Sequence, residues 1–126
     1  MSLENKLTDI AGEIQKLQVT SSKAIEARER LDAQLQENEL VRKEFTQLTE
    51  ENTVYKLLGP VLVKQDQAEA KSTVDTRLEF IRSEIKRVEA QIKDLDGQME
   101  KKKEELASVQ SAIQIRNRQN ASAGQP

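Results

Sequence analysis

The chain has 126 residues, of which 33% are charged, 36% are hydrophobic and 2% are aromatic, and its net charge is −2. So few large apolar side chains exclude an ordinary compact core, and the abundance of Glu, Lys, Gln, Leu and Ala indicates long helices or a coiled coil. Because the two signs of charge are interspersed, no basic surface favours binding to nucleic acid or to anionic lipid.

Residues 1–51 are predicted to form one long helix with a narrow apolar stripe. The stripe advances in steps of four and three residues, which is typical of a coiled-coil seam. Its apolar members are Leu3, Leu7, Ile10, Ile14, Leu17, Ala24, Leu31, Leu35, Val41, Phe45 and Leu48. A shortened step at Asn38 indicates local overwinding of the supercoil. Its polar members are Ser21, Arg28 and Asn38. Arg28 and Asn38 either set the register of the seam or are tolerated beside solvent, and the sequence does not separate these alternatives.

Residues 52–66 are predicted to form a β-hairpin. Two short runs rich in Val, Leu and Tyr flank Gly59 and Pro60, and this pair favours a turn whose type stays open. Side chains alternate between the faces of a strand, so both faces of this ribbon are apolar. A ribbon with two apolar faces and two open edges has to be covered by partners, which predicts an oligomerisation surface made of Val54, Tyr55, Leu57, Leu58, Gly59, Pro60, Val61, Leu62 and Val63. The alternative is a hydrophobic turn that only caps the coil.

Residues 67–118 are predicted to form a second long helix, followed by a disordered tail at 119–126. The stripe of this helix is apolar at every step except Lys102: Val74, Leu78, Ile81, Ile85, Val88, Ile92, Leu95, Met99, Leu106, Val109 and Ile113. The residues after Arg118 continue no apolar pattern.

Folding the chain back near residue 60 brings the two stripes into register. Ile10 then faces Val109, Ala24 faces Leu95, and no insertion interrupts the pairing. The predicted fold is dominated by α-helix: a long antiparallel helical coiled-coil hairpin with one β-hairpin at its base.

No catalytic site is expected in this chain. It contains no His and no Cys, which removes most nucleophile and general-base arrangements, and its four glycines are too scattered for a phosphate-binding loop. We therefore expect no enzyme activity, no metal and no cofactor. The absence of Cys favours a reducing compartment, and without a secretory pattern or a long apolar run the expected location is the cytosol or the nucleus.

The run VYKLLGPVLVKQ (residues 54–65) between two heptad arms resembles the prefoldin family, and most of all its β-type members. The resemblance extends over residues 7–113. It implies a subunit with one hairpin in an α2β4-type heterohexamer, whose hairpins form a double β-barrel platform carrying six coiled coils. It further implies a cytoplasmic, ATP-independent co-chaperone that captures non-native polypeptides, including actin and tubulin, and delivers them to the cytosolic chaperonin.

The resemblance directs attention to the helix ends opposite the hairpin. Seam residues of a two-stranded coil stay partly exposed and its last turns fray, so they offer a mobile apolar surface to an unfolded chain. The predicted client-binding tip consists of Leu3, Leu7, Ile10, Ile14, Val109 and Ile113. The alternative is that these residues only complete the seam. The alternative function for the whole chain is a structural coiled-coil adaptor that binds no client.

Overall fold

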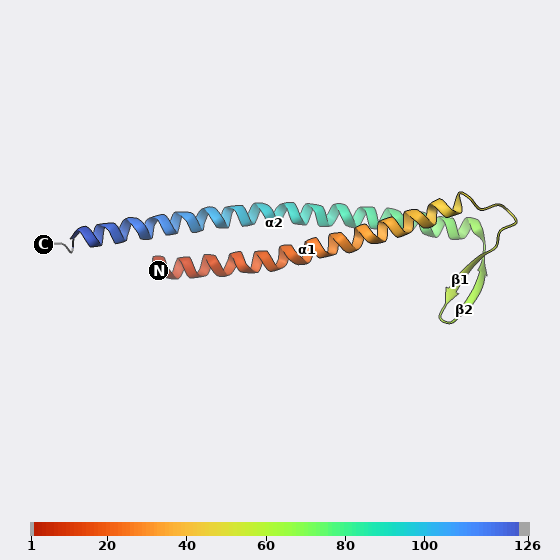
Figure 1. Ribbon diagram of the computed structural model, residues 1–126, viewed down its shortest axis with the longest axis horizontal. Coiled ribbons are helices and arrows are strands. Elements are labelled where there is room, and N and C mark those ends of the chain that lie inside the picture. Colours follow the sequence, from red (N-terminus) through yellow and green to blue (C-terminus); the bar gives the residue numbers. More distant parts are fainter. Residues whose placement is uncertain (1, 124–126) are drawn as a thin grey trace. The chain divides into compact units, whose positions relative to one another are not determined.

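The computed structural model describes residues 2–123, which form two helices and two strands in the order α1, β1, β2, α2 (Figure 1). Helix α1 spans Leu3–Phe45 and helix α2 spans Gln67–Ala123. Strands β1 (Val54–Leu58) and β2 (Val61–Gln65) pair antiparallel in a two-stranded sheet. The predicted fold class is confirmed.

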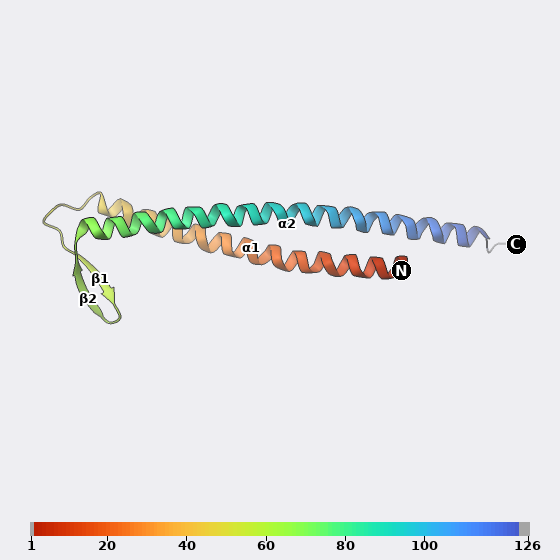
Figure 2. The same cartoon turned by 180° about the vertical axis from the view of Figure 1, so that it is seen from behind.

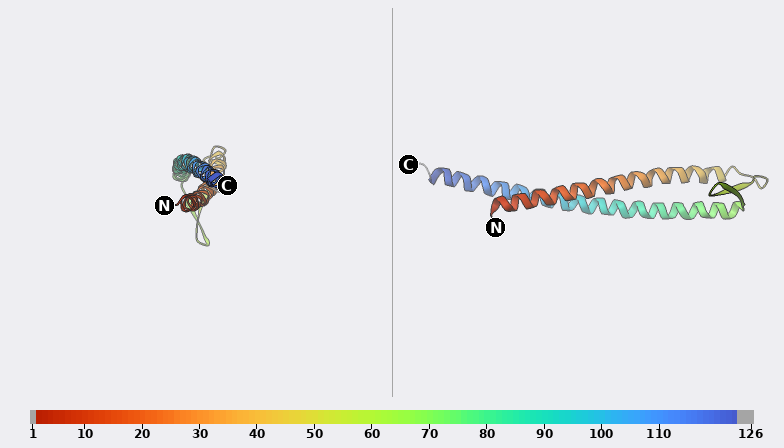
Figure 3. Two further views of the ribbon diagram at one scale, coloured as in Figure 1. Left: turned by 90° about the vertical axis from the view of Figure 1, so that its left-hand side faces the viewer. Right: turned by 90° about the horizontal axis from the view of Figure 1, so that it is seen from below.

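The chain divides into two compact units. One, which we call the terminal unit, holds the residues up to Glu26 and those from Ala90 onward; the other, the hairpin unit, is Ala27–Glu89. In each unit a segment of α1 runs antiparallel to a segment of α2 (Figure 2). The sheet belongs to the hairpin unit, from whose helical segments it projects (Figure 3).

Burial follows the predicted stripes. The buried side chains are the stripe residues Ala24, Val74, Leu78, Ile81, Ile85, Val88 and Leu95, together with Ala70, which lies four residues before the predicted stripe of α2 begins. The other stripe positions are half-buried, with the exception of Val41, which is 40% exposed. Val41 follows the shortened step at Asn38, where the stripe drifts away from the facing helix.

The helix starts have polar caps. The hydroxyl of Ser2 accepts a hydrogen bond of 3.1 Å from the amide of Asn5, and a carboxylate oxygen of Asp66 accepts one of 3.1 Å from the amide of Glu69. Both bonds satisfy amides of a first helical turn that have no partner inside the helix. Each capping residue directly precedes the first residue of its helix, which is Leu3 in α1 and Gln67 in α2.

Both predicted helix ends differ from the structure. Helix α1 ends at Phe45 rather than at residue 51, and residues 46–53 form turns in which Thr49 and Asn52 bond each other. Thr and Asn side chains compete with the helix for backbone partners, which explains the early end. Helix α2 continues beyond Arg118 to Ala123, because Gln, Asn, Ala and Ser tolerate a helix and no proline intervenes. The rest of the predicted tail, 124–126, lies outside the described residues.

Candidate functional site

The β-hairpin presents apolar side chains on both faces. Cross-strand pairs share a face, so the register Leu58↔Val61 and Lys56↔Val63 defines one face, and Leu57↔Leu62 with Tyr55↔Lys64 defines the other. Tyr55, Leu57, Leu58, Val61, Leu62 and Val63 are between 42% and 67% exposed. Val54 alone among the predicted apolar residues of the ribbon is half-buried, at the end next to the helices.

The turn of the hairpin is decided by Gly59 and Pro60. Gly59 has φ of 58°, a left-handed value that L side chains rarely adopt, and no other described residue has a positive φ. Two-residue hairpin loops use type I′ or II′ turns, and type I′ requires a positive φ at both central residues. Because the ring of Pro60 holds φ near −65°, the turn has the type II′ arrangement with glycine first.

Among residues 2–123, no other strand pairs with the outer edge of β1 or of β2. An uncovered edge is a row of unpaired amides and carbonyls ready to accept a further strand. Together with the exposed leucines and valines, these edges make the hairpin suited to pairing with another chain.

The predicted tip residues come together in the terminal unit. Leu3, Leu7, Ile10 and Ile14 on α1 and Val109 and Ile113 on α2 are all half-buried, so they form a seam that stays accessible from its sides. Ile115, next to this seam, is 53% exposed. The side chains of this seam are less buried than those of the seam in the hairpin unit, where Leu78 is 1% exposed.

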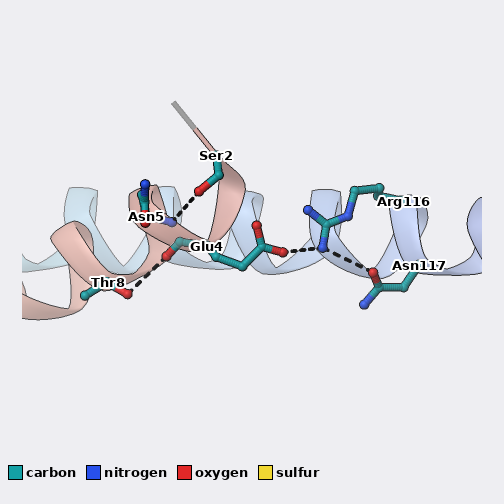
Figure 4. Close-up of polar contacts among 6 residues, drawn as sticks. All are labelled: Ser2, Glu4, Asn5, Thr8, Arg116 and Asn117. Atoms are coloured by element: carbon teal, nitrogen blue, oxygen red, sulfur yellow. Dashed lines mark hydrogen bonds and ion pairs between the residues drawn. The ribbon is translucent and has the colours of Figure 1, made fainter.

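Ion pairs cross from one helix to the other beside the apolar tip. The carboxylate of Glu4 pairs with the guanidinium of Arg116, as Figure 4 shows. The hydrogen bond from Arg116 lowers the pKa of Glu4 below that of an ordinary glutamate, and the same bond raises the pKa of Arg116. This pair links the first turn of α1 to Arg116 of α2.

Arg28 and Asn38, the polar seam residues of α1 whose roles the sequence left open, behave differently. Arg28 pairs with Glu89 of α2 at 3.0 Å and with Asp32 of its own helix at 3.6 Å. The side-chain Nδ2 of Asn38 donates instead to the carbonyl of Gln34 in its own helix, at 2.7 Å. Arg28 therefore contributes to the register of the two helices, whereas Asn38 is accommodated within one of them.

Sequence reasoning missed a set of exposed apolar residues on the helices. They lie off the regular stripes, and the sequence could have revealed them as apolar residues that do not fit the spacing of four and three residues: Val19, Ile25, Leu40 and Phe80. Phe80 borders a mainly apolar groove of about 540 Å³ with Gln34, Asn38, Thr76, Arg77 and Ile81.

Two kinds of site are not found in the described part of the chain. No group of three or more His, Cys, Asp or Glu residues within 2–123 is placed to hold a metal ion. Neither helix, over those same residues, contains a stretch long and apolar enough to cross a membrane.

Within the prefoldin family, residues 31–45 and 77–95 resemble subunit six of the eukaryotic complex. A family model described as "Prefoldin subunit" matches residues 3–112. Prefoldin subunit 6 of Homo sapiens is 45% identical over 124 residues, which cover 98% of this chain and 95% of the relative. Prefoldin subunit 6 of Saccharomyces cerevisiae is 44% identical over 103 residues, covering 82% and 90%.

The fold has a counterpart among solved structures. The crystal structure of the prefoldin beta subunit from Thermococcus strain KS-1 superposes with a TM-score of 0.75 at 20% identity, covering 85% of this chain and 91% of that one. The hairpin between two helices, the family model and the relatives along nearly the whole chain agree: this chain belongs to the prefoldin family.

Proposed function

We propose that this chain is a β-type subunit of an α2β4 heterohexamer that holds non-native polypeptides and passes them to the cytosolic chaperonin. Prefoldin subunits are components of a co-chaperone and assemble with one another. Nascent actin and tubulin are the proposed clients, and the cytoplasm is the proposed location. The observation that carries the proposal is the exposed hairpin, apolar on both faces and with open edges.

The hairpin supports assembly because it is unfavourable in water by itself. Six of its apolar side chains are about half exposed, and covering them contributes on the order of 5 kcal/mol or more before ordering costs. A two-stranded ribbon is marginally stable alone, so strands added to its edges also stabilise its own pairing. Oligomerisation through residues 54–63 resolves both problems.

The terminal unit supports client binding. Its seam residues are accessible without being fully exposed, which suits weak contact with a chain of no fixed shape. Several such arms acting on one client raise the holding strength through effective concentration, with no need for a tight single site. Release then requires no ATP.

Assembly is tested with Leu58→Asp combined with Val61→Asp. These cross-strand neighbours share a face, so the two carboxylates would be buried together in the assembled platform. We expect native mass spectrometry to show loss of the hexamer. Val19→Asp with Leu40→Asp is the matched control, since these residues are 51% and 63% exposed on helices. An intact hexamer carrying the hairpin double substitution would refute the proposed surface.

Client binding is tested with Leu7→Ser combined with Ile113→Ser. We expect an intact hexamer that suppresses the aggregation of denatured actin less well than the wild type does. Val19→Ser with Ile25→Ser, which removes exposed apolar side chains of α1 outside the seam, is the control. Wild-type hexamers that fail to slow aggregation at all would favour the structural adaptor instead.

A further inference from the structure

The connection between α1 and β1 contains a closed turn at Thr49–Asn52. The amide of Asn52 donates to the carbonyl of Thr49 at 3.1 Å, and the side-chain oxygen of Asn52 accepts from the amide of Thr49 at 2.7 Å. The hydroxyl of Thr49 donates to that same oxygen at 3.1 Å. Backbone and side chain therefore close the turn together.

Gln67, the first residue of α2, bonds this turn from outside. Its side-chain Nε2 donates to the carbonyl of Thr49 at 2.7 Å and to the carbonyl of Asn52 at 2.8 Å. A carboxamide nitrogen carries two hydrogens, so both are used on the turn. We call this arrangement of Thr49, Asn52 and Gln67 the clasp.

The clasp is anchored in α2. Asp66 caps the helix through its carboxylate, and its carbonyl accepts a hydrogen bond of 3.0 Å from the amide of Ala70. Gln67 is thereby held in a regular first turn. The clasp joins the chain just before β1 to the chain just after β2.

The direction of the hairpin depends on how the chain is held just before β1 and just after β2. Only Val54 and Gln65, the outermost residues of the strands, are half-buried, and every residue from Tyr55 to Lys64 is exposed. The ribbon projects away from the helical segments of the hairpin unit (Figure 3). Since little packing holds the ribbon along its length, its orientation has to be set at its ends.

We infer that Gln67 is a positioning residue for assembly, because it holds the hairpin in the orientation in which subunits join. Ordering a segment before association reduces the conformational entropy lost on binding. This inference rests on the proposed assembly through the hairpin.

The test compares four variants of the full chain. Gln67→Ala removes both donors, and Gln67→Glu keeps the shape while placing a carboxylate against two carbonyls. Gln67→Lys keeps donors in place of the amide. Ala68→Glu adds the same negative charge one residue away, at an exposed position in the same turn.

Two quantities are measured for each variant. Hydrogen–deuterium exchange of residues 49–53 in the isolated chain reports on the clasp, and the rate of complex formation with the other subunits reports on positioning. We expect Gln67→Ala and Gln67→Glu to show faster exchange and about tenfold slower assembly, with unchanged helical circular dichroism. Gln67→Lys should stay nearer the wild type, and Ala68→Glu should match it.

Unchanged exchange in Gln67→Ala would overturn the clasp itself. Faster exchange with wild-type assembly would overturn its role in positioning, as would equal slowing by Ala68→Glu. Failure of the proposed function has a different signature, since Leu58→Asp with Val61→Asp would then assemble normally.

Discussion

Lys102 of α2 and Glu13 of α1 form an ion pair, with 2.6 Å between the ammonium nitrogen and a carboxylate oxygen. Lys102 occupies the one position where the stripe of α2 lacks an apolar residue. The hydrogen bond to Glu13 raises the pKa of Lys102, and Glu105 of the same helix adds a second partner at 3.3 Å. Lys102 lies across the edge of the seam, and its ammonium group lies toward solvent and toward the carboxylates of Glu13 and Glu105.

Replacing Lys102 with Leu should stabilise the chain. A partly exposed ion pair contributes little, whereas an apolar residue at a seam position removes area from water. We expect a higher midpoint in urea unfolding followed by circular dichroism. Lys101→Leu, at the neighbouring exposed position, should leave the midpoint unchanged. A lower midpoint for Lys102→Leu would show that the ion pair outweighs the burial.

Leu78 should be the most sensitive seam residue of the hairpin unit. It is 1% exposed, so Leu78→Ala leaves a cavity and should lower the free energy of unfolding by about 2–5 kcal/mol. Phe80→Ala, two residues away on the same helix, removes a larger side chain that is 64% exposed and should change it by only about 0.5 kcal/mol. Equal losses in urea denaturation would contradict this reading of the seam.

The pair between Glu4 and Arg116 should be visible in the titration of Glu4, although an exposed ion pair contributes little to stability. The pKa of Glu4 is lowered in the folded chain by the hydrogen bond from Arg116, so the folded state binds this proton less readily than the unfolded state. The contribution is complete above the unfolded pKa and is lost as the pH falls through the folded one. Nuclear magnetic resonance titration should show a lower Glu4 pKa in the wild type than in Arg116→Gln; equal values would exclude the pair in solution.

Gly59 should tolerate few substitutions. With φ of 58°, Gly59→Ala places a β-carbon in a left-handed conformation at a cost of about 1–2 kcal/mol, although nothing lies within 4 Å of that carbon. We expect faster amide exchange in both strands of the isolated chain. Gly59→Asn, a residue that visits this conformation more readily, should have a smaller effect. If the strand amides of Gly59→Ala and Gly59→Asn both exchange at the wild-type rate, the turn is not of this type.

The sequence by itself determined the two apolar stripes, the antiparallel pairing of the helices and the position of the hairpin. These features depend on local periodicity and on the glycine–proline pair, so they can be read without knowing which residues touch. The apolar side chains on both faces of residues 54–63 also follow from strand alternation. Membership of the prefoldin family agrees with the predicted helices and with the predicted hairpin.

Only the tertiary structure decided how α1 ends, which seam residue sets register and what holds the hairpin. The turn that Thr49 and Asn52 close is bonded by Gln67, which lies 18 and 15 residues further along the chain. Arg28 and Asn38 are alike as polar residues on a stripe, and only the position of Glu89 separates their roles. Such outcomes depend on contacts between residues that are far apart in the sequence, and the periodicity of the sequence does not reveal those contacts.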